Sequence, residues 1–226
     1  MYSISVNKNR KLIPVYNEYL SIDEQEKASR FKFIIDQERF IISRAILRIL
    51  SGSFLKEDPK QIKFDYGEYG KPSYASNQNL KFNLSHSGDV IVIGFAESQE
   101  IGIDVEFIKT DFEVLKLAQK FFSKTEIIAL ENQPAEDLNR AFFRCWTRKE
   151  SFIKAEGSGL SFPLDQFAVS LENDHQSELL VTNWDYQEKS QWLLFSFIPS
   201  NEYIGAIAVK KKSAQIAYHD WYSLIT

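Results

Sequence analysis

The chain has 226 residues, of which 44% are hydrophobic and 26% are charged, a balance typical of a globular protein with a substantial core. Its net charge of −4 argues against general electrostatic binding of DNA or RNA. The single cysteine, Cys145, excludes an intramolecular disulfide, and no signal-like segment or apolar run of bilayer length is present. We therefore expect a cytoplasmic protein that binds neither nucleic acid nor a membrane.

The first hundred residues predict four elements: a strand over 2–6, a helix over 21–30, an amphipathic helix over 36–52 and a β-hairpin over 80–95. Ser21 and Glu24 form a capping-box pattern at the start of the first helix. The second helix carries three arginines that could bind a phosphate-rich ligand or simply cover the helix surface: Arg39, Arg44 and Arg48.

The rest of the chain predicts a strand over 101–107, helices over 112–122, 124–133 and 136–157, and antiparallel strands between 167 and 209. Ser123 and Glu126 again suggest a capping box, and Gly157 ends the longest helix. Each half thus combines a helix bearing basic residues with a group of strands. The two halves are therefore alike in outline, although no sequence repeat relates them.

The predicted strand IGIDVEF places two carboxylates on one face. Asp104 and Glu106 are two residues apart, so their Cβ atoms lie roughly 7 Å from each other and the charges repel. Either the face is solvated, or a cation compensates for the charges, in which case Glu150 can supply a third oxygen ligand. Glu150 and Lys154 are one helical turn apart, so an exposed ion pair is an equally simple explanation for them. Gly102, on the same strand face, is expected to leave room for a ligand.

The histidine and cysteine content limits which metal ion the protein could bind. Three scattered histidines and one cysteine cannot build a zinc site, so any metal is expected to have oxygen ligands, as Mg²⁺ does. Ser85 and His86 are neighbours in a strand and point to opposite faces, which argues against a Ser–His nucleophile. His86 is either structural or a donor to an anion. No Walker A loop or G-x-G-x-x-G motif is present.

Five segments, taken in order, resemble one family. They are YGKP, FNLSHSG, IGIDVEFIK, FFSKTE and CWTRKESFIKAEGSGLSFPLDQF, spanning roughly residues 66–169, and EKASRF extends the match toward the N-terminus. The segments resemble the 4'-phosphopantetheinyl transferases of the surfactin-synthetase-associated type. The most specific part is G-I-D-V-E followed some 45 residues later by W-x-x-K-E-x-x-x-K.

The resemblance implies a fold and an activity. The fold would be α+β and consist of two similar subdomains, residues 1–100 and 101–226, each a small antiparallel sheet packed with helices. They would be related by a pseudo-twofold axis, with the active site in the cleft between them. The activity would be transfer of 4'-phosphopantetheine from coenzyme A to a serine of an apo acyl, peptidyl or aryl carrier protein, with Mg²⁺ (or Mn²⁺) as the metal. Fatty-acid, polyketide and non-ribosomal peptide synthesis use such carriers, and a monomer is expected.

The resemblance also implies catalytic roles. Asp104, Glu106 and Glu150 match the family's metal-binding acids. Glu150 is further expected to act as general base, directly or through a metal-bound water. Lys154 matches the lysine that contacts the pyrophosphate and stabilises the leaving bisphosphate.

The nucleotide contacts carry over in the same way. Seven residues match family positions that contact the nucleotide: Lys27, Arg39, Gly70, Lys71, Pro72, Ser85 and His86. Glu24 stands where some relatives have a lysine, so Arg30 or Arg44 is an alternative contact to the 3'-phosphate. The carrier protein is expected to dock near Phe121 and Phe122, unless these side chains belong to the core.

Two other functions compete with this enzyme. A non-catalytic relative would bind coenzyme A or a carrier without turnover, but it would be expected to have lost one of the four residues Asp104, Glu106, Glu150 and Lys154. A Ca²⁺- or Mg²⁺-stabilised interaction domain would be expected to carry a D-x-D-x-D-G loop, which the sequence lacks.

Overall fold

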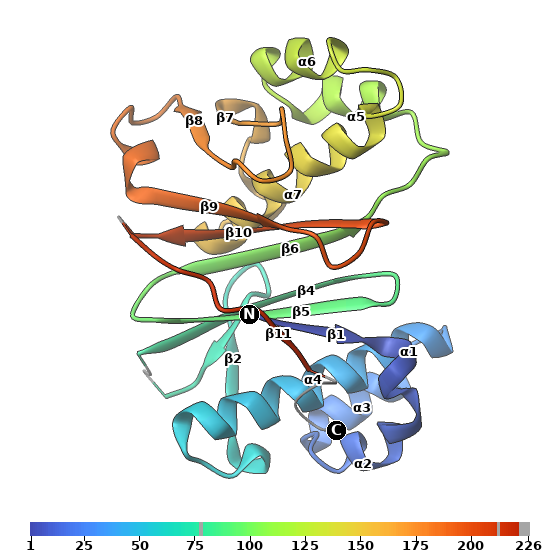
Figure 1. The fold of residues 1–226 in the computed structure, drawn as a ribbon. Helices are drawn as coiled ribbons and strands as arrows, with labels where there is room; N and C mark the ends of the chain where they lie inside the picture. Colours follow the sequence, from blue (N-terminus) through green and yellow to red (C-terminus); the bar gives the residue numbers. More distant parts are fainter. Residues whose placement is uncertain (77–78, 212, 222–226) are drawn as a thin grey trace.

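The computed structural model describes residues 1–76, 79–211 and 213–221, and Figure 1 shows two central sheets with helices on their outer sides. The first sheet has the order β11-β1-β5-β4, with β1 at Tyr2–Ser5, β4 at Leu80–Ser87, β5 at Val90–Glu97 and β11 at His219–Asp220. The pairs β1–β5 and β4–β5 are antiparallel, whereas β11 runs parallel to β1. A small hairpin joins β2 (Phe64–Tyr66) to β3 (Pro72–Tyr74).

The helices of the first half pack on one face of this sheet (Figure 1). They are α1 (Val6–Asn9), α2 (Ile13–Asn17), α3 (Ile22–Ser29) and α4 (Ile34–Leu55). Ile42 and Ile46 of α4 are buried together with Ile4, Ile91 and Ile93 of the sheet. Alternate residues of the strands and residues one helical turn apart on α4 thus face each other, and together they form the hydrophobic core of the first half.

The second sheet has the order β6-β10-β9, with all neighbours antiparallel. Its strands are β6 (Ile101–Phe107), β9 (Trp192–Phe197) and β10 (Tyr203–Lys210). Helix α7 (Leu138–Glu156) packs on its outer side, and α5 (Val114–Phe121) and α6 (Lys124–Glu131) lie beyond α7. A two-stranded sheet of β7 (Phe167–Val169) and β8 (Leu179–Thr182) lies beside them. The remaining helical turns are short 3₁₀ helices at Arg10–Leu12, Pro59–Gln61, Gly159–Ser161, Leu164–Gln166 and Glu188–Gln191.

The expected mixture of helices and antiparallel strands is confirmed, and so are the longer predicted elements. Both capping boxes form, at Ser21 and at Ser123, and Gly157 ends α7 with a positive φ of 78°. The sequence patterns missed the short helices between residues 6 and 17 and the last strand, β11. Next to β11, Trp221 is buried in the core of the first half, where its Nε1 donates to the Tyr16 hydroxyl at 3.2 Å.

The two sheets pack face to face through a third apolar cluster that includes Ile103 and Val105 of β6 and Val92 of β5. Because these odd-numbered residues of β6 face the first sheet, the even-numbered ones face α7. Gly102 shows how close this helix lies: an added Cβ would stand 2.0 Å from the Ser151 carbonyl oxygen and 2.4 Å from the Ala155 nitrogen. The expectation that Gly102 leaves room for a ligand is therefore wrong. The space is taken by the backbone of α7.

Candidate functional site

Helix α7 brings Lys154 to the carboxylate pair of β6. Nζ of Lys154 donates to Oδ1 of Asp104 at 2.6 Å and to Oγ of Ser85 at 3.0 Å. The Ser85 hydroxyl in turn donates to the same Asp104 oxygen at 2.8 Å. Asp104 is only 3% exposed, so the solvated-face explanation for this carboxylate is excluded. The salt bridge of Lys154 runs across to β6 and not along its own helix to Glu150.

Two carboxylate oxygens in this region are buried without a hydrogen-bond partner among the described residues. They are Oδ2 of Asp104 and Oε1 of Glu150. The second carboxylate of the pair, Glu106, accepts a hydrogen bond from the Ser87 hydroxyl at 2.8 Å. Buried polar atoms that lack partners are rare in folded proteins, and each carries a cost in free energy. These two oxygens are therefore available to bind a cation or a hydrogen-bond donor.

Burial and the neighbouring carboxylates raise the pKa of two carboxyl groups in the site. Burial raises the pKa of Glu150 to about 7, and repulsion from Asp104 and, to a lesser degree, Glu106 adds to this effect while Lys154 opposes it. Burial also raises the pKa of Glu106, again with repulsion from Asp104. A bound cation would remove this repulsion, because its charge favours the ionised form of each carboxylate.

The residues fit a hard, oxygen-liganded cation by the chemistry of their donors. Asp104, Glu106 and Glu150 all line one cavity of about 360 Å³. Across the part of the chain that the structure describes, however, no three His, Cys, Asp or Glu side chains are gathered closely enough to form a metal shell by themselves. Mg²⁺ commonly binds through one or two carboxylates together with water and phosphate oxygens, so an incomplete protein shell suits it.

The raised pKa of Glu150 predicts how the stability of the protein changes with pH. Since the folded-state pKa lies above its ordinary value, stability falls as the pH rises from about 4.5 to 7. We expect Glu150→Gln to stabilise the metal-free protein by about 2–3 kcal/mol at pH 8 and by almost nothing at pH 4.5. Urea unfolding in a chelator at both pH values measures this difference. The exposed Glu113→Gln is the control, and an equal effect of Glu150→Gln at the two pH values would contradict the prediction.

His86 lies beside the same cavity, with Arg39 close to it. Burial lowers the pKa of His86, and the positive charge of Arg39 lowers it further. Arg39 donates to the Gly88 carbonyl at 3.1 Å and to Asp36 at 2.9 Å, while its Nε is buried without a partner among the described residues. Lys27 stays exposed, with its Nζ 5.4 Å from the centre of the Phe40 ring. The structure thus joins Arg39 and His86, whereas Lys27 lies on the surface.

A second cavity, of about 650 Å³, lies next to the first and shares Leu84, Glu150 and Lys154 with it. Gly70, Lys71 and Pro72 line it, and Gly70 has a positive φ of 76° that favours glycine in the turn. Nζ of Lys71 donates to the Ala155 carbonyl at 3.0 Å and lies 3.3 Å from a Glu100 carboxylate oxygen. Burial lowers the pKa of Lys71, and Glu100 opposes this shift.

Glu24 and two arginines of α4 form a buried ionic cluster. Nε of Arg48 lies 2.7 Å from Oε2 of Glu24, and Nε of Arg44 lies 3.4 Å from Oε1. Glu24 also accepts from the backbone N–H of Ser21 and so caps α3. Both arginine side chains are therefore buried and do not cover the helix surface, and Nη1 of Arg44 has no hydrogen-bond partner among the described residues. Of the two alternative contacts considered for the 3'-phosphate, Arg44 is engaged by Glu24, while Arg30 is exposed and lies 3.5 Å from Glu26.

Sequence reasoning missed several residues that hold the site together. Nζ of Lys149, next to Glu150, donates to both oxygens of Glu126 at 2.8 Å and to the Phe167 carbonyl at 2.7 Å. Asn83 and Ser87 of β4 contact β6 beside Asp104 and Glu106. The available signal was the alternation of polar residues along an otherwise apolar strand, Asn83-x-Ser85-x-Ser87.

The two phenylalanines at the expected docking region have different environments. Phe122 is buried in the core and stacks on Phe142 with ring centres 5.1 Å apart. Phe121 is 38% exposed and meets Trp146 edge-on at 5.8 Å. Trp146 also lines the cavity of the three carboxylates. Of the pair, only Phe121 presents its ring to solvent next to this cavity.

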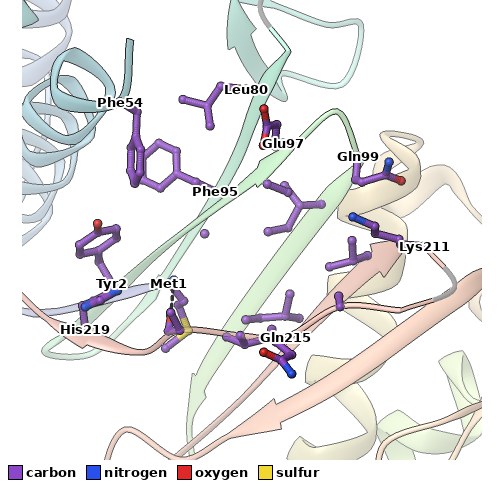
Figure 2. A pocket seen from close by; sticks show the side chains of 18 of the residues that line it. Met1, Tyr2, Phe54, Leu80, Phe95, Glu97, Gln99, Lys211, Gln215 and His219 are labelled. Atoms are coloured by element: carbon purple, nitrogen blue, oxygen red, sulfur yellow. Dashed lines mark hydrogen bonds between the residues drawn. The ribbon is translucent and has the colours of Figure 1, made fainter. Parts of the chain in front are cut away.

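A third cavity, of about 910 Å³, is larger than the other two and lies apart from the predicted site residues. Figure 2 shows it lined by Tyr2, which stacks on His219 at 5.0 Å, and by the tilted pair Phe54 and Phe95 at 4.9 Å. None of the residues proposed for the metal, the catalytic step or the nucleotide lines it. Volume alone therefore does not locate the chemistry.

Comparison with known proteins assigns the family. Residues 100–208 match the model of the 4'-phosphopantetheinyl transferase superfamily, and residues 10–98 match that of the 4'-phosphopantetheinyl transferase N-terminal region. The 4'-phosphopantetheinyl transferase HetI of Nostoc is 34% identical over 84% of this chain and 78% of its own. The 4'-phosphopantetheinyl transferase Sfp of Bacillus subtilis is 38% identical over 71% of this chain and 70% of its own. The 4'-phosphopantetheinyl transferase psf-1 of Bacillus pumilus is 34% identical over 91% of this chain and 85% of its own.

The family models and the relatives thus define the class of protein, an enzyme of the 4'-phosphopantetheinyl transferase type. This chain belongs to the 4'-phosphopantetheinyl transferase superfamily, which confirms the resemblance seen in its motifs. A solved holo-[acyl-carrier-protein] synthase of Thermotoga maritima aligns with 50% of this chain and 64% of its own at a TM-score of 0.37 and 21% identity, too low a similarity to carry an argument. No helix in the described ranges has the length and apolarity to cross a membrane.

Proposed function

We propose that the protein transfers the 4'-phosphopantetheine group of coenzyme A to a serine of an apo carrier protein and releases adenosine 3',5'-bisphosphate, in a reaction that depends on Mg²⁺. The observation that carries this proposal is the gathering of Asp104, Glu106, Glu150 and Lys154 around one cavity, with two buried carboxylate oxygens that lack partners. Acyl, peptidyl and aryl carriers are the proposed substrates.

The two adjoining cavities suggest how coenzyme A binds. Gly70, Lys71 and Pro72 would contact the adenine, and His86 with Arg39 and Lys27 would bind the 3'-phosphate, with Ser85 beside the nucleotide. Lys154, which both cavities share, would then meet the pyrophosphate. Arg39 and Lys154 carry positive charges close enough to lower the pKa of His86. These charges support an anion-binding role for the part of the cavity around His86.

Asp104, Glu106 and Glu150 would hold Mg²⁺ (or Mn²⁺), which when bound supplies charge neutralisation for the pyrophosphate. The carrier serine oxygen forms a bond to the β-phosphorus, and the bond from that phosphorus to the bridging oxygen breaks. Glu150 would take the serine proton, and the ammonium of Lys154 would stabilise the negative charge on the leaving bisphosphate.

The proposal extends to the organisation of the chain. Residues 1–100 would supply the nucleotide contacts, and residues 101–226 the metal ligands, the catalytic helix and the carrier dock. Each half sets a long helix, α4 or α7, against antiparallel strands, which supports a pseudo-twofold relation with the active site in the cleft between the halves. We propose a cytoplasmic monomer.

A direct assay tests this function. The protein is incubated with coenzyme A, Mg²⁺ and several purified apo carriers, and each carrier is weighed by intact mass spectrometry. We expect the mass of one phosphopantetheine group to be added to the carrier serine, and none in a chelator. Absence of the adduct on acyl, peptidyl and aryl carriers alike would refute the proposal.

Phe121 gives a test of the docking region. Phe121→Ala is expected to raise KM for the carrier by about tenfold, because an exposed aromatic anchor is lost, and to leave KM for coenzyme A unchanged. Initial rates at varied carrier and varied coenzyme A separate the two constants. Phe112→Ala, which removes another ring that is 40% exposed, is the matched control. A carrier KM within twofold of wild type for Phe121→Ala would place the dock elsewhere.

A further inference from the structure

The two central sheets also meet through polar side chains that reach from β4 to β6. Strand β4 is the last strand of the first sheet, and β6 is the first strand of the second. Figure 1 shows the two strands side by side. Each is paired through its backbone to a different neighbour, β4 to β5 and β6 to β10. The contact between them is made by side chains.

Polar side chains of β4 replace the backbone hydrogen bonds of a continuous sheet. The amide oxygen of Asn83 accepts from the Ile103 N–H at 2.9 Å, and the hydroxyl of Ser87 accepts from the Phe107 N–H at 3.0 Å. Both pairs are separated by 20 residues in sequence, so the strands run parallel and in register. Side chains of β4 thus separate the two strands and supply acceptors for two backbone N–H groups of β6.

The same side chains reach the two carboxylates of β6. The Ser85 hydroxyl donates to Oδ1 of Asp104, and the Ser87 hydroxyl donates to Oε2 of Glu106, both at 2.8 Å. Because Ser87 accepts from the Phe107 N–H, its single hydroxyl hydrogen is directed to Glu106. One oxygen of Glu106 is therefore tied to β4, and this fixes the side-chain rotamer with which the carboxylate lines the cavity.

We propose that Ser87 is a positioning residue for Glu106, which it orients toward the cation through this hydrogen bond. The inference rests on the proposed metal-dependent function. Groups that hydrogen-bond to metal ligands commonly change metal affinity by about 10–100-fold when they are removed. Ala at position 87 would leave both Glu106 and the Phe107 N–H without this partner, whereas Thr keeps a hydroxyl in the same place.

The test measures Mn²⁺ binding by electron paramagnetic resonance in the presence of coenzyme A, together with the Mg²⁺ concentration for half-maximal transfer. We expect Ser87→Ala to raise the Mn²⁺ Kd and the half-saturating Mg²⁺ concentration by about tenfold each, and Ser87→Thr to restore both. Ser190→Ala is the control, since that hydroxyl donates to the Gln187 carbonyl at 2.7 Å in the β8–β9 connection. Its constants should equal those of wild type.

A wild-type Mn²⁺ Kd in folded Ser87→Ala overturns the inference, and so does a failure of Ser87→Thr to restore binding. If circular dichroism shows that Ser87→Ala is unfolded, Ser87→Cys carries the same test, because a thiol keeps the volume with a weaker donor. Asp104→Ala in the same titration separates this inference from the proposed function. Unchanged Mn²⁺ binding in Asp104→Ala refutes the metal site itself, whereas loss of binding there with no change in Ser87→Ala refutes only the role of Ser87.

Discussion

Asp104→Ala is expected to lower the rate of phosphopantetheine transfer by at least about a thousandfold and to make nucleotide binding independent of the metal. Three functions of the side chain are lost together. Oδ1 no longer pairs with Lys154 at 2.6 Å, the buried Oδ2 is no longer available to a cation, and the repulsion that raises the pKa of Glu150 disappears.

Two measurements check this result. Transfer is followed by carrier mass under single-turnover conditions, and binding of adenosine 3',5'-bisphosphate is measured by calorimetry with Mg²⁺ and with a chelator. The exposed Asp65→Ala on β2 is the control and should behave as wild type. If Asp104→Ala still transfers the group in a chelator, the assignment of Asp104 as a metal ligand is wrong.

Lys149→Met is expected to lower the free energy of unfolding by about 3–5 kcal/mol, because it leaves the charge of Glu126 buried without its counter-ion. The Lys149 side chain is fully buried, at 0% exposure, and Glu126 is 1% exposed. Glu126 also accepts from the Ser123 N–H at the start of α6 and from the Val169 N–H of β7. One buried pair therefore joins α6, β7 and the helix that carries Glu150.

Urea unfolding of the metal-free protein measures the loss. Lys116→Met is the matched control, because Lys116 pairs with Glu113 at the surface and such pairs contribute at most about 1 kcal/mol. The double variant Glu126→Gln/Lys149→Met should recover part of the loss, since it removes the orphaned charge. A loss in Lys149→Met no larger than in Lys116→Met would show that the buried pair does not stabilise the fold.

The sequence was a good guide wherever a property depends on neighbours along the chain. The capping boxes at Ser21 and Ser123, the glycine end of α7 and the long helices follow from local spacing, and the structure confirms them. The placement of Asp104 and Glu106 on one strand face is likewise a consequence of strand alternation. Linear motifs were also sufficient to reveal the enzyme family.

Contacts between residues that are far apart in the sequence could be identified only from the tertiary structure. Lys154 pairs with Asp104, 50 residues away in sequence, and not with Glu150 on its own helix face. Gly102 has no side chain, so the backbone of α7 can pack closely against β6. Glu24 forms ion pairs with both Arg44 and Arg48. Nothing in local periodicity specifies these contacts, because they depend on how closely separate elements pack.

The chemical groups of the site and the elements that carry them are therefore determined by the sequence itself. Which of those groups touch, which are buried without a partner and which serine holds Glu106 was decided only when β4, β6 and α7 came together. The physical reason is range: propensity and alternation act over a few residues, whereas burial and hydrogen-bond satisfaction are properties of the packed chain.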